Sequence, residues 1–186
     1  QTCALPIYFL KRIPGATGKG PISLAIWTTT TWTLPASQAV ALNAEIDYAL
    51  VEFDAGQGTE RVLLAKSLVE TLMQGWGIAG YRIVGETLGK ALEGVKLKHP
   101  FYDRQVPVVL GEHVTLDAGT GAVHTAPGHG QEDFALGLQY KLPVDNPVDG
   151  NGVYLPKTPI FGGEHIYKAN DHIVQVLKDQ IGRAHV

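Results

Sequence analysis

The sequence predicts an α+β domain, an irregular and mainly antiparallel β-barrel with flanking helices. Short segments rich in β-branched and aromatic residues alternate with Gly, Asp and Pro turn signals between residues 21 and 116, which is typical of the short strands of a barrel. Apolar residues at helical spacing are confined to three segments. The 186 residues, 45% of them hydrophobic, are enough to close one compact domain.

Five strands are expected. The first begins at Pro21, where the segment PISLAIWTTTTWTL combines β-branched and aromatic residues and is stopped by Pro35. The second is expected at residues 48–53. Three further short strands are expected at residues 81–84, 108–110 and 113–116, separated by Gly, Asp and Pro turn signals.

Leucine spacing predicts the first helix, at residues 62–74. Leucines recur there every four residues with Val69 and Met73 beside them, which places the apolar side chains on one helix face. Gly75 and Gly77 then end the helix.

Two more helices are expected toward the end of the chain. Residues 131–140 mix apolar residues with helix formers, and Gly130 suits a helix entry. Asp133 then falls in the first helical turn. Asn170 can cap a last helix whose apolar residues share one face.

The two ends of the chain look foreign to this domain. One set of codons for residues 1–7 (QTCALPI), read as the reverse complement in a shifted frame, encodes residues 181–186 (IGRAHV). Such a relation resembles a translated sequencing adapter. We therefore expect the domain at residues 21–179, a tail at 1–20 whose first residues are adapter-derived, and an adapter-derived tail at 180–186.

Charge and cysteine content exclude several classes of function. The net charge is −3 with 18% charged residues, so no large basic surface is expected and any RNA contact should be local. The single cysteine, Cys3, has no internal disulfide partner, which favours a reducing, cytoplasmic setting. No apolar run approaches the roughly 20 residues that span a bilayer, so no membrane partner is expected.

Four consecutive threonines, Thr28, Thr29, Thr30 and Thr31, stand between Trp27 and Trp32 at the end of the first expected strand. Threonine favours strands, so the run could be ordinary strand sequence with hydroxyls on alternate sides. The alternative is a set of hydroxyls for an oxygen-rich ligand. Four polar residues in a row favour it, because they indicate that the strand has opened into a loop.

A second polar segment, GTGAVHTAPGHGQED, holds His124, His129, Glu132 and Asp133. Pro127 and Gly128 separate the two histidines and exclude the one-face helical spacing of a zinc pair, so no metal is expected. No serine lies in a GxSxG turn, and the glycines lack a phosphate-binding lysine, so neither a protein nucleophile nor a cofactor is expected. Asp133 alone could be a first-turn carboxylate favoured by the helix dipole.

The segments WTTTTWTLPA and GTGAVHTAPGHGQEDF, about ninety residues apart, together resemble the editing domain of isoleucyl-tRNA synthetases. HPFYDRQVPVVLGEHVTLDAGTG, NPVDGNGVYLP and YKAND extend the resemblance from residue 21 to about 179. The sequence departs from the family pattern at Thr31, where proline is common, at Ser37, where asparagine is common, and at Glu132, where aspartate is frequent.

The resemblance implies the class I synthetase editing fold and a cleft between the two segments for the terminal adenosine of a charged tRNA. It implies that Thr28, Thr29 and Thr30 line the adenosine and ester side of the cleft, with Trp27 and Thr33 close by. His124 would limit the size of the amino-acid side chain, with His129 nearby. Asp133 would hold the α-ammonium group of the substrate.

The resemblance further implies post-transfer editing, the hydrolysis of the ester in valyl-tRNA(Ile), by a deacylase without cofactors. Its partners would be the 3' end of aminoacylated tRNA(Ile) and the rest of the synthetase with its catalytic Rossmann domain. The HIGH and KMSKS signatures of an isoleucine–tRNA ligase are absent, so this chain alone is not expected to aminoacylate. The alternative is a non-catalytic tRNA-binding or scaffold module of the same fold.

Overall fold

The structure, a computed structural model, describes residues 3–8, 16, 22–56 and 58–181. Within these residues the strands are β1 (Cys3–Tyr8), β2 (Ser23–Thr28), β3 (Ala39–Leu42), β4 (Asp47–Asp54), β5 (Thr59–Ala65), β6 (Tyr81–Leu88), β7 (Lys96–Lys98), β8 (Gln105–Leu110) and β9 (Ala122–Thr125). The α-helices are α1 (Val69–Gly75), α2 (Gln131–Tyr140) and α3 (Ile166–Ile181). Three 3-10 helices accompany them, η1 (Thr31–Ala36), η2 (Lys66–Leu68) and η3 (Gly89–Leu92).

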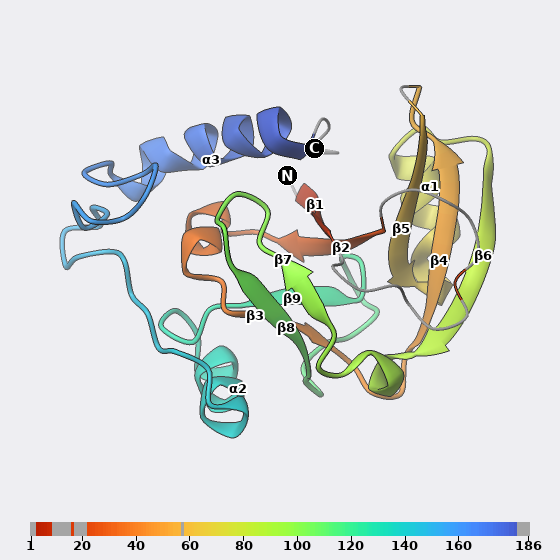
Figure 1. Ribbon diagram of the computed structural model, residues 1–186, viewed down its shortest axis with the longest axis horizontal. Coiled ribbons are helices and arrows are strands. Elements are labelled where there is room, and N and C mark those ends of the chain that lie inside the picture. The colour runs from red at the N-terminus through yellow and green to blue at the C-terminus, as the bar shows by residue number, and fades with distance from the viewer. Residues whose placement is uncertain (1–2, 9–15, 17–21, 57, 182–186) are drawn as a thin grey trace.

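The strands form one curled, mixed sheet in the order β6-β4-β5-β2-β9-β3-β8-β7, with β1 also paired to β2 (Figure 1). Five of the eight strand pairs described are antiparallel, and β2–β5, β2–β9 and β3–β8 are parallel. The predicted α+β class with a mainly antiparallel, barrel-like sheet is therefore confirmed.

Strand β1 lies in the N-terminal segment that the sequence analysis left outside the domain. It pairs antiparallel with the whole of β2, from Cys3 opposite Thr28 to Tyr8 opposite Ser23. The remaining tail residues, apart from Ala16 and the last two residues of α3, lie outside the described part of the chain. The boundaries at residues 21 and 179 stay a prediction.

The core lies on both faces of the curled sheet because successive strand residues point to opposite sides. In β4 and β5, Leu50 and Leu63 join the larger cluster, whereas Val51 and Leu64 join a second cluster on the other face. Helix α1 covers the second cluster with Met73 and its neighbours. The larger cluster is completed by α3 and by the segment before it. These two faces hold β2 and β9 rigidly in the middle of the sheet.

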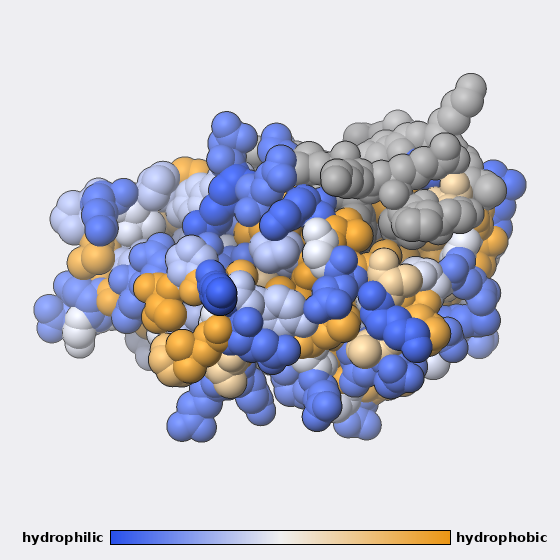
Figure 2. All heavy atoms as spheres, turned by 60° about the horizontal axis from the view of Figure 1, so that its bottom comes forward, coloured by the Kyte–Doolittle hydropathy of each residue, from blue (hydrophilic) through white to orange (hydrophobic). Residues whose placement is uncertain are grey.

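Helix α2 packs on the sheet near β3 and β8, with Leu136 buried against Ala39 and Val109. Its other side is open to solvent, where Phe134 is 45% and Leu138 is 64% exposed. The surface on the face shown in Figure 2 is a mosaic of hydrophilic residues and smaller hydrophobic areas. Among the described residues, no helix is both long and apolar enough to cross a membrane.

The predicted helix at residues 62–74 is wrong in its first third. Residues 62–65 belong to β5, and the α-helix begins at Val69. A spacing of four residues is a multiple of the strand period of two, so the leucine pattern could not distinguish the two structures. Residues 62–65 are all apolar and all buried. Such a continuous apolar run is typical of a central strand.

Two further expectations are corrected. The strand at residues 113–116 is absent, because the chain turns there and the Val114 N–H donates to the Gly111 carbonyl at 3.3 Å. Asn170 does not cap the last helix, because α3 begins at Ile166 and Asn170 lies inside it. The expected strands near 48–53, 81–84 and 108–110 and the helix at 131–140 are confirmed, while β3, β7 and β9 were not predicted.

Candidate functional site

The threonine run stands where β2 opens into a loop. The strand ends at Thr28, and η1 begins at Thr31. The N–H of Thr30 donates to Thr28 Oγ1 at 3.0 Å, and the Thr29 and Thr30 hydroxyl oxygens lie 3.4 Å apart. Thr29 is exposed, so its hydroxyl faces solvent as a ligand-binding group would.

The GTG sequence docks the second polar segment onto β2. A Cβ atom on Gly119 would lie 2.8 Å from the Trp27 side chain, and one on Gly121 would lie 2.4 Å from Ala65 Cβ. Both glycines also have positive φ, which side chains disfavour. Between them the Thr120 hydroxyl donates to the Ala25 carbonyl at 2.7 Å. The glycines therefore serve close packing, and half-buried Trp27 lies beneath them.

This docking aligns β9 with both β2 and β3. Trp27 is the partner of Val123 in the parallel β2–β9 pair, and His124 is opposite Val40 in the antiparallel β3–β9 pair. The two predicted segments thus become neighbours in the sheet. His124 is brought to the threonine peptide across 91 residues of sequence.

Thr33 joins the two segments through one hydroxyl. Its Oγ1 donates to the Thr30 carbonyl at 2.8 Å and lies 3.1 Å from His124 Nε2. A hydroxyl has one proton, so the proton in the second bond must come from the imidazole. His124 is then the Nε2–H tautomer, and its Nδ1 carries a lone pair. That Nδ1 is buried and has no partner among the described residues.

Asp133 is held at the start of α2 by the backbone of the preceding loop. The Ala126 N–H donates to Asp133 Oδ2 at 2.9 Å, and the His129 N–H donates to the Ala126 carbonyl at 2.8 Å. Gly130 precedes the helix in an extended conformation, as predicted for the entry residue. The second carboxylate oxygen of Asp133 remains available to a ligand, because no described hydrogen bond uses it.

His129 lies between this loop and the threonine peptide. Its ring meets that of Trp32 edge-on, with the centroids 5.2 Å apart. Its Nε2 is buried without a described partner. The structure thus brings together Thr28, Thr30, Thr33 and His124 directly, and adds His129 through Trp32. Asp133 joins them through the Ala126 turn and has no described contact with the threonines.

Burial sets the protonation of the two histidines. Burial lowers the pKa of His124 from 6.5 to about 4, and the neighbouring His129 adds to this shift. Burial also lowers the pKa of His129, against the opposing effects of Asp145 and Asp133. His124 is therefore neutral at neutral pH, as the tautomer assignment requires.

Burial acts in the opposite direction on the carboxylate. It raises the pKa of Asp133, and the hydrogen bond from the Ala126 N–H opposes this rise. His113 and His129 also oppose it, whereas Glu132 adds to it. A cationic ligand group would stabilise the charged form, since an opposite charge within a few ångström favours ionisation.

Side chains that the sequence analysis did not single out hold the carbonyls of η1. His99 Nε2 lies 3.1 Å from the Leu34 carbonyl, and the buried ring accepts hydrogen bonds on Nδ1 from the next loop. Arg104 Nη2 donates to the carbonyls of Pro35 and Ser37 at 2.8 and 2.6 Å. Both residues lie in the HPFYDR segment. The dense run of aromatic and basic residues before β8 was the signal from which the sequence analysis could have found them.

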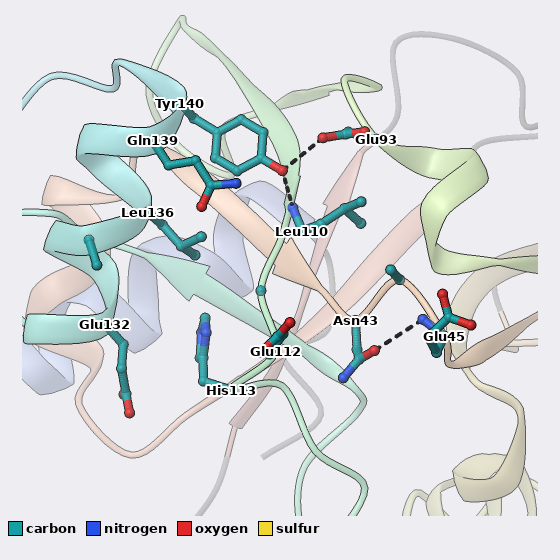
Figure 3. Close-up of a pocket in the computed structure, with 13 residues that line it drawn as sticks. Asn43, Glu45, Glu93, Leu110, Glu112, His113, Glu132, Leu136, Gln139 and Tyr140 are labelled. Atoms are coloured by element: carbon teal, nitrogen blue, oxygen red, sulfur yellow. Dashed lines mark hydrogen bonds between the residues drawn. The ribbon is translucent and has the colours of Figure 1, made fainter.

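Two cavities flank this site. The first, of about 660 Å³, lies beside α2 and is lined by Glu132, Leu136 and Tyr140, with Glu112 and His113 opposite (Figure 3). The second, of about 580 Å³, lies between Pro35, Tyr102, Arg104, Asp145 and Ile160. Neither cavity is lined by the threonine run or by Asp133, so both are neighbours of the predicted site. Within the described residues, no group of three or more His, Cys, Asp or Glu side chains could hold a metal ion.

Comparisons with known proteins match most of the chain. A sequence model described as "Leucyl-tRNA synthetase, editing domain" matches residues 77–167. The isoleucine–tRNA ligase of Methylococcus capsulatus is 61% identical over 166 residues, which is 89% of this chain and 18% of the relative. That of Nitrosococcus oceani is 58% identical over 169 residues, or 91% and 18%. The chain therefore spans less than a fifth of the length of these relatives.

Solved structures share the fold at low sequence identity. A leucyl-tRNA synthetase CP1 domain, GlLeuRS-CP1, superposes with a TM-score of 0.72 at 13% identity and covers 97% of both chains. The cytosolic leucyl-tRNA synthetase editing domain of P. knowlesi gives 0.71 at 9% identity, covering 96% of this chain and 94% of that one. These likenesses show the architecture of the curled sheet and its helices.

Proposed function

Because this chain belongs to the isoleucyl-tRNA synthetase family, in which it forms the editing domain, we propose that it hydrolyses the ester of mischarged valyl-tRNA(Ile). One observation carries the proposal. The Thr33 hydroxyl connects the Thr30 carbonyl to the His124 ring, so the threonine peptide and the histidine segment form one site. The substrate would lie between this connection and Asp133.

The threonine hydroxyls position the attacking water. We propose water as the nucleophile, which attacks the carbonyl carbon of the ester directly. The bond to the ribose oxygen breaks, one proton from water reaches that oxygen, the second proton is released to solvent, and valine leaves as the carboxylate. Thr28, Thr29 and Thr30 orient the water together with the free ribose hydroxyl of the substrate. Orientation of this kind supplies a large part of the acceleration.

Asp133 fixes the amino-acid end of the substrate. Its Oδ2 is engaged by the Ala126 N–H, which orients the carboxylate while leaving Oδ1 for the α-ammonium group. Burial raises the pKa of the empty carboxyl, so the ammonium group both binds the carboxylate and stabilises its charge. The ester carbonyl is then held at a set distance from the threonines.

His124 limits the side chain that the site accepts. Its ring is buried, neutral and fixed by Thr33, which makes it a rigid wall. An isoleucine site cannot strongly reject valine, because one missing methylene is worth about 1–3 kcal/mol, a magnitude known from isoleucyl-tRNA synthetases themselves. A second site completes the discrimination between valine and isoleucine if its wall overlaps with the larger isoleucine side chain and excludes it.

The proposed partners follow from this chemistry. The 3' end of aminoacylated tRNA(Ile) is the substrate, and the rest of the synthetase, with its catalytic Rossmann domain, delivers it. The whole protein would then be an isoleucine–tRNA ligase of the cytoplasm. No cofactor is required, because the water, the ester and the polar side chains account for every bond that changes.

Single-turnover deacylation tests the proposal directly. The full chain is mixed with valyl-tRNA(Ile) or isoleucyl-tRNA(Ile), and the loss of each ester is followed against buffer alone. We expect faster loss of the valyl ester and little effect on the isoleucyl ester. Binding of both tRNAs without any acceleration would instead indicate the non-catalytic tRNA-binding module.

A further inference from the structure

An unpredicted hydrogen bond ties the threonine peptide to the last helix. The Thr31 hydroxyl donates to Asn170 Oδ1 at 2.6 Å, across 139 residues of sequence. Oδ1 of an amide can only accept, so the direction of this bond is fixed. Thr31 directly follows Thr30 and is the first residue of η1. The bond therefore acts at the point where the threonine loop becomes a helix.

Asn170 is rigidly placed for this contact. It lies inside α3, whose Ala169, Ile173 and Leu177 are fully buried in the larger core cluster. Asparagine is a poorer helix former than alanine, so its place inside a helix has a local cost. The hydrogen bond to Thr31 is the compensating contact that the structure shows.

The same C-terminal segment holds the peptide at a second point. The Tyr154 hydroxyl donates to the Trp32 carbonyl, next to Thr31. Tyr154 is buried, and its ring packs near that of Phe161. Two consecutive residues of η1 are thus held by the C-terminal segment, whereas Thr29, which precedes η1, is exposed.

We propose that Asn170 is a positioning residue for ester hydrolysis, which holds Thr28, Thr29 and Thr30 in place by fixing Thr31. This inference rests on the proposed function. A proline at this position would restrain the backbone through its ring, which fixes φ. Threonine leaves φ free to vary, and the hydrogen bond from its hydroxyl limits that freedom instead. Loss of the bond widens the range of positions that the three hydroxyls occupy and lowers the fraction aligned with the water.

Proline at position 31 offers a way to replace the bond. Its ring fixes φ near about −65°, within the range of a 3-10 helix, and the first position of a helix tolerates the missing N–H. Thr30, which would precede the proline, is already non-helical with φ −132° and ψ 77°. Thr31→Pro should therefore fix the loop without help from Asn170.

The experiment measures kcat and KM for valyl-tRNA(Ile) deacylation by full-chain variants. Asn170→Ala and Thr31→Val should each lower kcat by about 3- to 10-fold, the range expected from one hydrogen bond, with KM little changed. The double variant should be no slower than either single variant. Asn170→Asp and Thr31→Ser retain an acceptor and a donor, respectively, and should keep most of the activity.

Two controls separate positioning from stability. Gln175→Ala removes a side chain on α3 whose hydrogen bond, among the described residues, is to Asp179 in the same helix, and it should leave kcat unchanged. In the Thr31→Pro background, Asn170→Ala should change kcat by less than about 2-fold. A loss of kcat that persists in this background, or that Gln175→Ala reproduces, overturns the proposal.

Hydrogen exchange gives a readout that does not depend on activity. Backbone amides of residues 28–33 should exchange about 3- to 10-fold faster in Asn170→Ala and Thr31→Val, and at the wild-type rate in Gln175→Ala. If the wild-type chain fails to deacylate, the proposed function fails while this measurement still tests the restraint. Unchanged exchange and unchanged kcat in Asn170→Ala would reject the positioning role.

Discussion

The Nε2 atom of His124 lies 3.1 Å from the hydroxyl oxygen of Thr33, and both side chains are buried. The bond joins the strand that carries the histidine to the peptide that carries the threonines. Thr33 also donates to the Thr30 carbonyl. One hydroxyl therefore holds both the histidine ring and the threonine loop.

Removal of the Thr33 hydroxyl should destabilise the site. Thr33→Val keeps the shape but leaves the His124 Nε2–H without an acceptor, which costs about 1–3 kcal/mol when the group is buried. The free energy of unfolding, measured in urea, should fall by that amount. Thr33→Ser retains the hydroxyl and serves as the control, and an equal loss in both variants would show that the methyl group rather than the bond matters.

His124→Ala should alter selectivity more than rate. The ring supplies a wall and no proton transfer, so valyl-tRNA(Ile) hydrolysis should largely remain. Isoleucyl-tRNA(Ile) should become a substrate, because the overlap that excludes one methylene is gone. Initial deacylation rates on both charged tRNAs decide this. If the variant loses valyl-tRNA(Ile) hydrolysis and still spares isoleucyl-tRNA(Ile), His124 has a catalytic or structural role instead.

Asp133→Ala should reduce deacylation by about 10²-fold or more. A carboxylate about 4 Å from an ammonium group contributes around 4 kcal/mol at an effective dielectric of 20, and desolvation lowers that figure. Asp133→Asn is the matched variant, since its amide oxygen can still accept from the Ala126 N–H. Both variants should be inactive, while Asn should keep the wild-type Tm. Full activity in Asp133→Asn would show that only the hydrogen bond is needed.

Acid should destabilise the fold through its buried imidazoles. The unfolded chain protonates His124 near pH 6.5, whereas burial lowers the pKa in the folded chain to about 4. The unfolded state thus binds more protons between these values, and the free energy of unfolding falls as pH falls from about 6.5 to 4. Above that window His124 is neutral in both states and adds no pH dependence to the stability. His99, whose pKa burial lowers to about 3, acts in the same direction.

Thermal unfolding as a function of pH checks this expectation. The wild-type Tm should decline from pH 6.5 downward, and His124→Asn should decline less steeply because one of the two imidazoles is absent. Above pH 7, Tm should change with pH equally in the two proteins. An identical slope for both proteins below pH 6.5 would contradict the protonation assigned to His124.

Much of the fold and the family followed from local sequence. The helix at 131–140 was predictable because Gly130, the acidic first turn and the helix formers all act within a few residues. The opening of β2 at the threonines was predictable for the same reason. The pairing of WTTTTWTLPA with GTGAVHTAPGHGQEDF was sufficient to identify the family, which the comparisons then confirmed. The proposed roles of the individual site residues stay predictions.

The errors lie where long-range contacts decided the structure. Leucines spaced by four fit both a helix and a strand, and only pairing with β4 and β2 placed residues 62–65 in a strand instead of the helix that follows. Short β9 was missed because its four residues gain their partners from β2 and β3. Asn170 has the local character of a helix cap, yet its acceptor atom serves Thr31.

The sequence by itself determined the class of fold, the family and the residue types of the site. Only the tertiary structure decided that Thr33 joins His124 to the threonine loop, that His99 and Arg104 hold the carbonyls of η1, and that Asn170 fixes Thr31. The physical reason is the range of the interactions. Backbone propensity and capping act over a few residues, whereas these hydrogen bonds join groups 65–139 residues apart that only the folded sheet and its packed helix bring together.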